Sequence, residues 1–143
     1  MGKIKKINLL VIGGTGFIGF HLIKFAKAKG WKVSSVSLHN PSKSKKINGV
    51  KYFKLDISKL NLLKKILIKQ YDYVVNLSGY IDHISYRCGG RRLISQHFDS
   101  LQNLVQTLSR KKLKRFVQIG SSDEYGNGAA PQNEKLREHA ISP

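Results

Sequence analysis

The chain has few of the residues from which disulfide frameworks, metal sites and membrane spans are built. Cys88 is the only cysteine among 143 residues, which excludes an internal disulfide and a cysteine-rich metal site. The five histidines show no metal-site spacing, and no apolar run reaches the 18 residues that a membrane helix needs. The apolar run after the basic N-terminus is also too short for a signal peptide. These absences predict a soluble, cytoplasmic protein that binds neither a metal nor a membrane.

Acidic residues are scarce as well. Eight Asp and Glu residues stand against 26 Lys and Arg, so the formal net charge is +18, and no acid precedes Asp56. This excess predicts nonspecific, salt-sensitive binding to polyanions. A dedicated nucleic-acid-binding function is the less favoured interpretation, because the lysines are spread over every expected helix and loop, arginines are few, and no nucleic-acid-binding motif is present.

Glycines are concentrated in one short segment, Gly13-Gly14-Thr15-Gly16-Phe17-Ile18-Gly19. It follows an apolar run over residues 7–12 that is typical of a strand buried on both faces of a parallel sheet, and it precedes apolar residues at helical spacing. At such a turn, Gly13 permits a tight bend, Gly16 lets backbone N–H groups approach a phosphate, and Gly19 lets the helix pack on the strand. The segment therefore predicts a loop that binds the pyrophosphate of a dinucleotide.

The rest of the chain alternates between strand-like and helix-like segments. Further strands are expected at residues 32–38, 50–55, 71–77 and 114–120. Helices are expected after the glycines, after Ser58 as a capping residue, and from about residue 93 to about residue 109. This alternation predicts a doubly wound, parallel α/β sheet of about five strands with a Rossmann-like fold.

The residues after the second strand bear on the choice of cofactor. In dinucleotide-binding folds, an acid near the end of this strand binds the ribose 2′-hydroxyl of NAD. Ser37 stands at that place here, and His39, Asn40 and the lysines at positions 43, 45 and 46 follow it. A neutral strand end with cations beyond it tolerates a 2′-phosphate, so we predict NADP in preference to NAD. The alternative is that these lysines belong to a mobile, solvated loop.

Four motifs in order resemble those of the extended short-chain dehydrogenases/reductases, the NAD(P)-dependent nucleotide-sugar epimerases and dehydratases. They are the glycine segment, Leu55-Asp56-Ile57, Asn76-Leu77-Ser78-Gly79, and Ser121-Ser122-Asp123-Glu124-Tyr125-Gly126. The resemblance covers nearly the whole chain and implies transient hydride transfer with a nucleotide-sugar-like substrate in the full-length protein, and it is compatible with a homodimer. Together with the strand-end argument, it makes the following residues candidates for cofactor binding: Gly13, Gly16, Phe17, Ile18, Gly19, Ser37, His39, Asp56, Ile57, Leu77, Ser78 and Gly79.

The last motif contains the candidate catalytic residues. In the family, a Ser or Thr four positions before the Tyr of Tyr-Gly holds the reacting oxygen, which points to Ser121, with Ser122 as the alternative. Asp123 and Glu124 resemble the paired acids with which sugar 4,6-dehydratases remove water, although their spacing to Tyr-Gly is one residue short. Epimerase or reductase chemistry is therefore favoured over dehydration, and a solvated acidic turn explains the two acids equally well.

Two further hypotheses concern the segment after the fourth strand. His97 stands where the family often has a helical Asn near the active site, but a surface or partly packed histidine is the favoured interpretation. Arg87, Arg91 and Arg92 are candidates for contact with a substrate diphosphate, and a solvated loop is an equal alternative.

The family's catalytic Tyr-x-x-x-Lys is not found, because none of the six tyrosines is followed by Lys at the fourth position. In the family, this Tyr takes a hydroxyl proton while hydride moves to the nicotinamide. We therefore expect residues 1–143 to form a single NAD(P)-binding domain that ends before this motif, has no substrate domain and catalyses little or no turnover. It is then either the cofactor-binding part of such an enzyme or a noncatalytic, truncated dinucleotide-binding protein.

Overall fold

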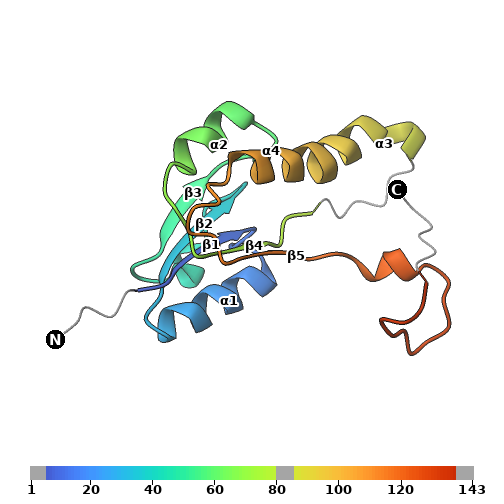
Figure 1. Ribbon diagram of the computed structural model, residues 1–143, viewed down its shortest axis with the longest axis horizontal. Coiled ribbons are helices and arrows are strands. Elements are labelled where there is room, and N and C mark those ends of the chain that lie inside the picture. Colours follow the sequence, from blue (N-terminus) through green and yellow to red (C-terminus); the bar gives the residue numbers. More distant parts are fainter. Residues whose placement is uncertain (1–5, 80–85, 138–143) are drawn as a thin grey trace.

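The computed structural model describes residues 6–79 and 86–137. Its strands form one parallel sheet of five strands in the order β3-β2-β1-β4-β5 (Figure 1). They are β1 (Asn8–Ile12), β2 (Lys32–Ser37), β3 (Lys51–Lys54), β4 (Tyr73–Asn76) and β5 (Arg115–Gln118). The predicted parallel α/β sheet is confirmed, and all five expected strands are present.

Helices cover both faces of the sheet. α1 (Phe17–Ala28) lies on one face, and α2 (Leu60–Ile66) lies on the other beside a long helical stretch (Figure 1). That stretch consists of α3 (Tyr86–Leu93), the π-helical turn η2 (Ile94–Asp99) and α4 (Ser100–Thr107), and two short 3-10 turns, η1 (Lys43–Lys45) and η3 (Ser122–Tyr125), complete the elements. No helix within residues 6–79 or 86–137 is long and apolar enough to cross a membrane.

The long helical stretch begins earlier than the sequence pattern predicts. It was expected from about residue 93, yet α3 already begins at Tyr86. Gly89 and Gly90 are poor helix formers, so they obscure this part of the helix in the sequence.

The central strand carries the core of both faces. Leu9, Leu10, Val11 and Ile12 are at most 2% exposed, as expected of a strand covered on both sides. One cluster joins the sheet to α2 and α4 through Leu10, Ile12, Val36, Val74, Leu63 and Leu104. The second cluster joins it to α1 through Leu9, Val11, Val33, Ile23 and Ala26.

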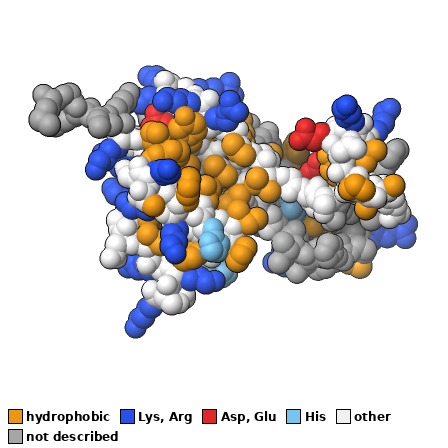
Figure 2. Space-filling view, turned by 90° about the horizontal axis from the view of Figure 1, so that it is seen from below, with side chains coloured by type: hydrophobic (Ala, Val, Ile, Leu, Met, Phe, Trp, Pro, Cys, Tyr) orange, Lys and Arg blue, Asp and Glu red, His pale blue; other side chains and the backbone are white. Residues whose placement is uncertain are grey.

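α1 packs on the sheet through a side that contains neither Phe17 nor Phe25. Its buried residues are Gly19, Ile23 and Ala26, whereas Phe17 and Phe25 are 78% and 63% exposed. A Cβ at Gly19 would collide with the carbonyl oxygen of Gly13, so only glycine lets the helix lie this close to the preceding turn. The aromatic side chains therefore stay at the surface. Figure 2 shows the molecule from the α1 side, where hydrophobic side chains gather in a patch.

Ser58 does not cap α2, contrary to the sequence prediction. The N-cap residue is Lys59, and no side chain caps the helix. The N–H of Ser58 instead donates to Oδ1 of Asp56 at 2.9 Å. Asp56 therefore forms a local turn before the helix, as aspartates commonly do.

Candidate functional site

All five strands end at one edge of the sheet, and the predicted site residues follow those ends. Gly13 follows β1, Ser37 ends β2, and the remaining three strands lead to Asp56, Leu77 and Ser121. This carboxyl edge lies at the right of the sheet in Figure 1. The connections reverse direction between β1 and β4, and open parallel sheets bind ligands at such a switch point.

The loop after β1 is a tight backbone turn. Gly13 has φ = +78°, a left-handed conformation that favours glycine. Its N–H donates to the carbonyl of Val36 at 2.8 Å, and its own carbonyl accepts from the N–H of Gly16 at 3.1 Å. A Cβ at Gly13 would lie only 3.0 Å from the carbonyl oxygen of Leu77. The turn is thus held closely between the ends of β2 and β4.

Gly14 is also tightly constrained, although the sequence pattern assigns it no separate role. A Cβ at Gly14 would collide with Oγ of Ser35 and lie 2.6 Å from Cδ1 of Ile23. Both neighbours are buried, so the glycine lets the loop pack closely against β2 and α1. The second glycine of the motif could have indicated this close packing.

α1 starts directly from this loop with an uncapped end. Gly16 is the N-cap residue, no side chain in the described part of the chain caps it, and the first turn contains no acid. The first N–H groups of the helix are therefore available to an anion, and the helix dipole adds about half a positive charge. Phe17 and Ile18 form this first turn and are exposed, so the loop is open to a ligand.

Ser37 lies against the glycine loop. Its side chain is 8% exposed, and its Oγ accepts a hydrogen bond from the N–H of Thr15 at 3.2 Å. Its carbonyl accepts from the N–H of Leu55 at 2.8 Å. Ser37 thus links the loop to β2 and to the segment that leads into Asp56, while His39 beyond it is exposed.

Asp56 and Ile57 occupy the turn after β3. Asp56 is half-buried and Ile57 is buried. The side-chain amide of Asn103 in α4 donates to the carbonyls of Ile57 and Ser58 at 3.4 and 3.0 Å. Asn103 positions this turn from a neighbouring helix, and sequence analysis missed it because the partners are far apart in the chain.

The end of β4 is organised by a buried amide. Asn76 is 3% exposed, and its Nδ2 donates to Oε1 of Gln118 at 2.8 Å. Its Oδ1 accepts from both the hydroxyl and the N–H of Ser78, at 2.6 and 3.1 Å. Asn76 therefore fixes Ser78 and ties the end of β4 to β5.

His97 comes close to the same strand end from the helical stretch. A Cβ at Gly79 would lie 3.6 Å from Cε1 of His97. His97 belongs to the π-helical turn η2, and such turns often occur at functional sites. The side chain is exposed, as the favoured interpretation held, but it lies at the border of the site.

The two candidate serines follow β5 and are exposed. The N–H of Ile119 donates to the carbonyl of Asn76 at 3.1 Å, which brings this segment next to the end of β4. Oε1 of Glu124 accepts from the N–H of Ser121 at 3.0 Å, so this carboxylate caps its own 3-10 turn. Asp123 belongs to the same turn, but its side chain lies outside the described part of the structure.

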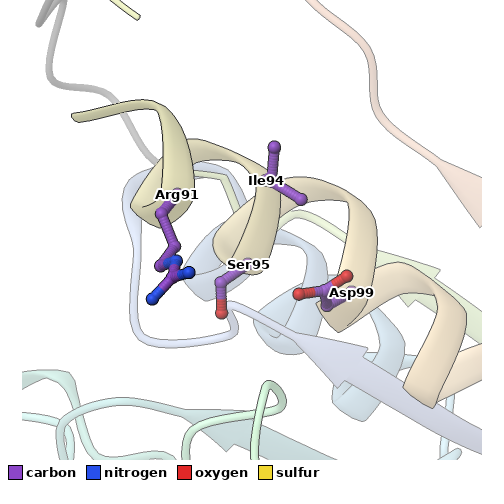
Figure 3. Close-up of a pocket in the computed structure, with 4 residues that line it drawn as sticks. All are labelled: Arg91, Ile94, Ser95 and Asp99. Atoms are coloured by element: carbon purple, nitrogen blue, oxygen red, sulfur yellow. The ribbon is translucent and has the colours of Figure 1, made fainter. Parts of the chain in front are cut away.

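A surface pocket of about 600 Å³ lies along α3 and η2. It is lined by Arg91, Ile94, Ser95 and Asp99. Figure 3 shows Arg91, Ser95 and Asp99 projecting from the same side of the helical stretch, whereas Ile94 points away from them. Of the three arginines considered for a substrate diphosphate, only Arg91 lines this pocket, and Asp99 places a negative charge in the same lining.

Comparison with protein families gives one match that covers nearly the whole chain. The model of the NAD dependent epimerase/dehydratase family matches residues 9–143. The chain is 29% identical over 133 residues to the UDP-N-acetyl-alpha-D-glucosaminuronate decarboxylase of Bacillus cytotoxicus. That alignment covers 90% of this chain and 41% of the decarboxylase.

Solved structures show the same fold. The UDP-N-acetylglucosamine 4-epimerase from Methanobrevibacter ruminantium M1, in complex with UDP-N-acetylmuramic acid, has a TM-score of 0.79 at 26% identity, covering 97% of this chain and 46% of its own. The UDP-glucose 4-epimerase of Thermus thermophilus, in complex with NAD, has a TM-score of 0.80 at 18% identity, covering 95% and 45%. The chain thus spans less than half the length of each of these proteins.

Proposed function

The chain belongs to the NAD dependent epimerase/dehydratase family, and from that premise we propose that it binds a dinucleotide cofactor at the carboxyl edge of its sheet. We also propose that the chain is the cofactor-binding portion of an enzyme that transiently oxidises a nucleotide-sugar-like substrate. The UDP-N-acetylmuramic acid bound to one of the two solved epimerases supports this substrate class, and the NAD bound to the other supports the cofactor.

The observation that carries the proposal is the uncapped start of α1 behind the Gly13 turn. A pyrophosphate needs close backbone approach and several N–H donors, and this helix end offers both. Gly16 is exposed, and a Cβ there would already lie 3.3 Å from the carbonyl oxygen of Gly13. A larger residue at Gly16 therefore narrows the space that the phosphates need.

The remaining site residues have separate roles in this proposal. Gly13, Gly16 and the first turn of α1 hold the pyrophosphate, and Asp56 with Ile57 lies toward the adenine. Leu77, Ser78 and Gly79 line the nicotinamide side, where the bound cofactor supplies a hydride acceptor. Ser121, or alternatively Ser122, holds the reacting oxygen of the substrate by a hydrogen bond. The proton-accepting Tyr-x-x-x-Lys is not among these residues, so the chain binds and orients rather than moving the proton.

We propose NADP as the preferred cofactor. The end of β2 presents no carboxylate for the 2′-hydroxyl of NAD, and the Ser37 hydroxyl is already held by the loop. The exposed Lys43 and Lys45 of η1 follow on the same connection. Their positive charges favour a 2′-phosphate over a hydroxyl.

The experiment is a parallel calorimetric titration of the chain with NADP⁺ and NAD⁺. We expect saturable binding of both, with NADP⁺ tighter by about tenfold, or about 1.4 kcal/mol. Gly16→Val is the loop variant and is expected to lose both ligands, whereas Lys43→Gln with Lys45→Gln weakens NADP⁺ alone. Tighter NAD⁺ contradicts the NADP preference, and binding of neither ligand contradicts the dinucleotide site itself.

The hydrogen bond that Glu124 accepts from the backbone of Ser121 bears on the type of reaction. Since Oε1 of Glu124 is engaged by the backbone of Ser121, epimerase or reductase chemistry is supported over dehydration for the whole enzyme. The same contact, together with the missing Tyr-x-x-x-Lys, supports a noncatalytic dinucleotide-binding protein as the second candidate. A dedicated nucleic-acid-binding protein without a cofactor is the third, and the titration above separates it from the other two.

A further inference from the structure

The five parallel strands also share the edge at which they begin, opposite the glycine loop. Lys32, Lys51 and Arg115 are the first residues of β2, β3 and β5, and the turns and segments that lead into the strands add further cations. We define the basic rim as the ten exposed cations at this edge among the residues that the structure describes, which are Lys6, Lys29, Lys32, Lys51, Lys69, Arg110, Lys111, Lys112, Lys114 and Arg115. In the sequence these residues are scattered over more than a hundred positions, and only the parallel topology brings them together.

The pairing register places the strand starts within two residues of one row. Lys32 lies opposite Asn8 of β1, and Arg115 lies opposite Tyr73, which pairs with Leu9. Lys51 lies opposite Ser34, two residues beyond Lys32. The N–H of Lys114 donates to the carbonyl of Asp72 at 2.8 Å, which places Lys114 at the start of the same row. Neighbouring strands lie about 4.8 Å apart, so five strand starts span about 19 Å. The rim is therefore a strip of positive charge along the edge at which the strands begin.

Among the acids of residues 6–79 and 86–137, Asp72 lies at the rim. It is 6% exposed, and its Oδ2 accepts a hydrogen bond from the N–H of Asn8 at 2.8 Å. The others follow strand ends or lie in later segments, namely Asp56, Asp99, Asp123, Glu124 and Glu134. Figure 2 shows many blue side chains around the left end, where the strands begin, with a small red area among them, and both red and blue side chains toward the right.

The rim cations also act on one another. The pKa of Lys69 is lowered, first by partial burial and then by the positive charges of Lys51 and Lys32. Mutual repulsion of this kind means that an anion brought to the rim relieves an unfavourable interaction as well as gaining new ones.

We propose that the basic rim is a sequence-independent binding surface for the phosphate backbone of nucleic acid. Duplex DNA carries one charge per about 1.7 Å of axis when both strands are counted, so a length equal to the rim carries about 11 phosphates, of which one side faces the protein. Eight of the ten rim residues are lysines, which act as point charges and do not select bases as bidentate arginines do. An anionic membrane would also bind a basic surface, and it would bury exposed apolar side chains beside the cations. Two such side chains lie next to the rim, Ile68 at 81% exposed and Phe25 at 63% with Nζ of Lys29 over its ring, so the vesicle experiment below separates a membrane from nucleic acid.

This surface and the proposed cofactor site lie at opposite edges of the sheet. The rim proposal therefore does not depend on dinucleotide binding, and both ligands can be bound together. That separation provides a direct control, because saturating NADP⁺ leaves the affinity for DNA unchanged if the rim is the binding surface. Displacement of DNA by NADP⁺ places the polyanion on the glycine loop instead and contradicts the proposal.

The main experiment is fluorescence anisotropy with a short random-sequence DNA duplex over a series of salt concentrations. The rim variant combines Lys32→Glu, Lys51→Glu and Lys69→Glu. The control variant combines Lys24→Glu, Lys54→Glu and Lys135→Glu, which are exposed, lie away from the rim and change the net charge equally. Lys54 is the opposite end of the strand that begins at Lys51.

We expect the rim variant to lose at least about tenfold in affinity at about 0.1 M salt, with the slope of log K against log salt falling by about 2.7, or 0.9 per lost phosphate contact. The control variant is expected to keep most of its affinity and slope. Equal losses in both variants mean that total charge alone drives binding, and this contradicts a located surface.

Two additional arms complete the test. Phosphatidylserine vesicles and polyglutamate replace the duplex, and tighter binding of either one by the unmodified chain contradicts nucleic acid as the ligand.

If circular dichroism shows the rim variant to be unfolded, Arg110→Gln, Lys111→Gln and Lys112→Gln are combined in the exposed turn before β5. This second variant is also expected to bind DNA more weakly and with a smaller salt slope, and unchanged binding overturns the proposal.

Discussion

The backbone N–H of Thr15 donates a hydrogen bond to Oγ of Ser37 at a distance of 3.2 Å. This bond joins the glycine loop to the end of the neighbouring strand, and it is shielded because Ser37 is 8% exposed. The position of the loop therefore depends on a side chain 22 residues away as well as on its own glycines.

Replacing this serine tests the coupling between strand and loop. In Ser37→Ala the N–H of Thr15 loses its acceptor, so we expect the free energy of unfolding to fall by about 1 kcal/mol. NADP⁺ binding is expected to weaken, because the loop is less firmly placed. Urea denaturation and calorimetric titration measure the two effects, and Ser44→Ala in the exposed turn η1 is the matched control. Wild-type values for both quantities in Ser37→Ala contradict the prediction.

Gly19 and Gly16 are expected to separate stability from ligand binding. A Cβ at Gly19 would meet backbone atoms, including the Cα of Gly14 at 2.6 Å, and backbone cannot move aside cheaply. We therefore expect Gly19→Ala to lower the free energy of unfolding by about 1–3 kcal/mol, as overpacking does. Gly16→Ala, where the nearest contact is 3.3 Å, is expected to change stability far less. Similar denaturation curves for the two variants count against this assignment.

The buried Tyr71 predicts a specific loss of stability at alkaline pH. Burial raises the pKa of Tyr71 above its ordinary value of 10.0, and a side-chain hydrogen bond with Ser34 partly opposes that shift. Above pH 10 the hydroxyl of Tyr71 loses its proton in the unfolded chain but keeps it in the folded protein. The stabilisation that the protonated Tyr71 gives the folded state is therefore complete below pH 10, and it is lost as pH rises through the folded pKa. The free energy of unfolding is expected to fall more steeply above pH 10 in the wild type than in Tyr71→Phe. Parallel pH profiles of the two proteins rule out this role.

The chain itself is expected to bind a cofactor without turning over a nucleotide sugar. None of its six tyrosines is followed by Lys at the fourth position, and general acid–base catalysis commonly contributes about 10²-fold to 10⁴-fold to rate. Incubation with UDP-glucose and NADP⁺, followed by NMR of the sugar, measures this directly, and cofactor binding in the same sample serves as the control. Product formed by a preparation of verified intact mass overturns the expectation.

Local sequence patterns were sufficient to predict the strand and the turn that frame the candidate site. The apolar run of β1 predicts a strand covered on both faces, and the glycine segment predicts a tight turn, because each pattern is specified within a few consecutive residues. The helical spacing of α1 was a weaker guide. It predicts a helix, but the side that faces the sheet was chosen by the clearance at Gly19 rather than by Phe17 and Phe25.

By itself, then, the sequence determined the parallel α/β sheet, the turn at Gly13 and the absence of an acid at the end of β2. Tertiary structure alone decided which distant groups meet there, such as Thr15 with Ser37 and Asn103 with the turn after β3. It also decided that scattered lysines share one edge. The physical reason is that strand and turn propensities are local, whereas contacts between strand ends depend on the order and register in which the strands pair.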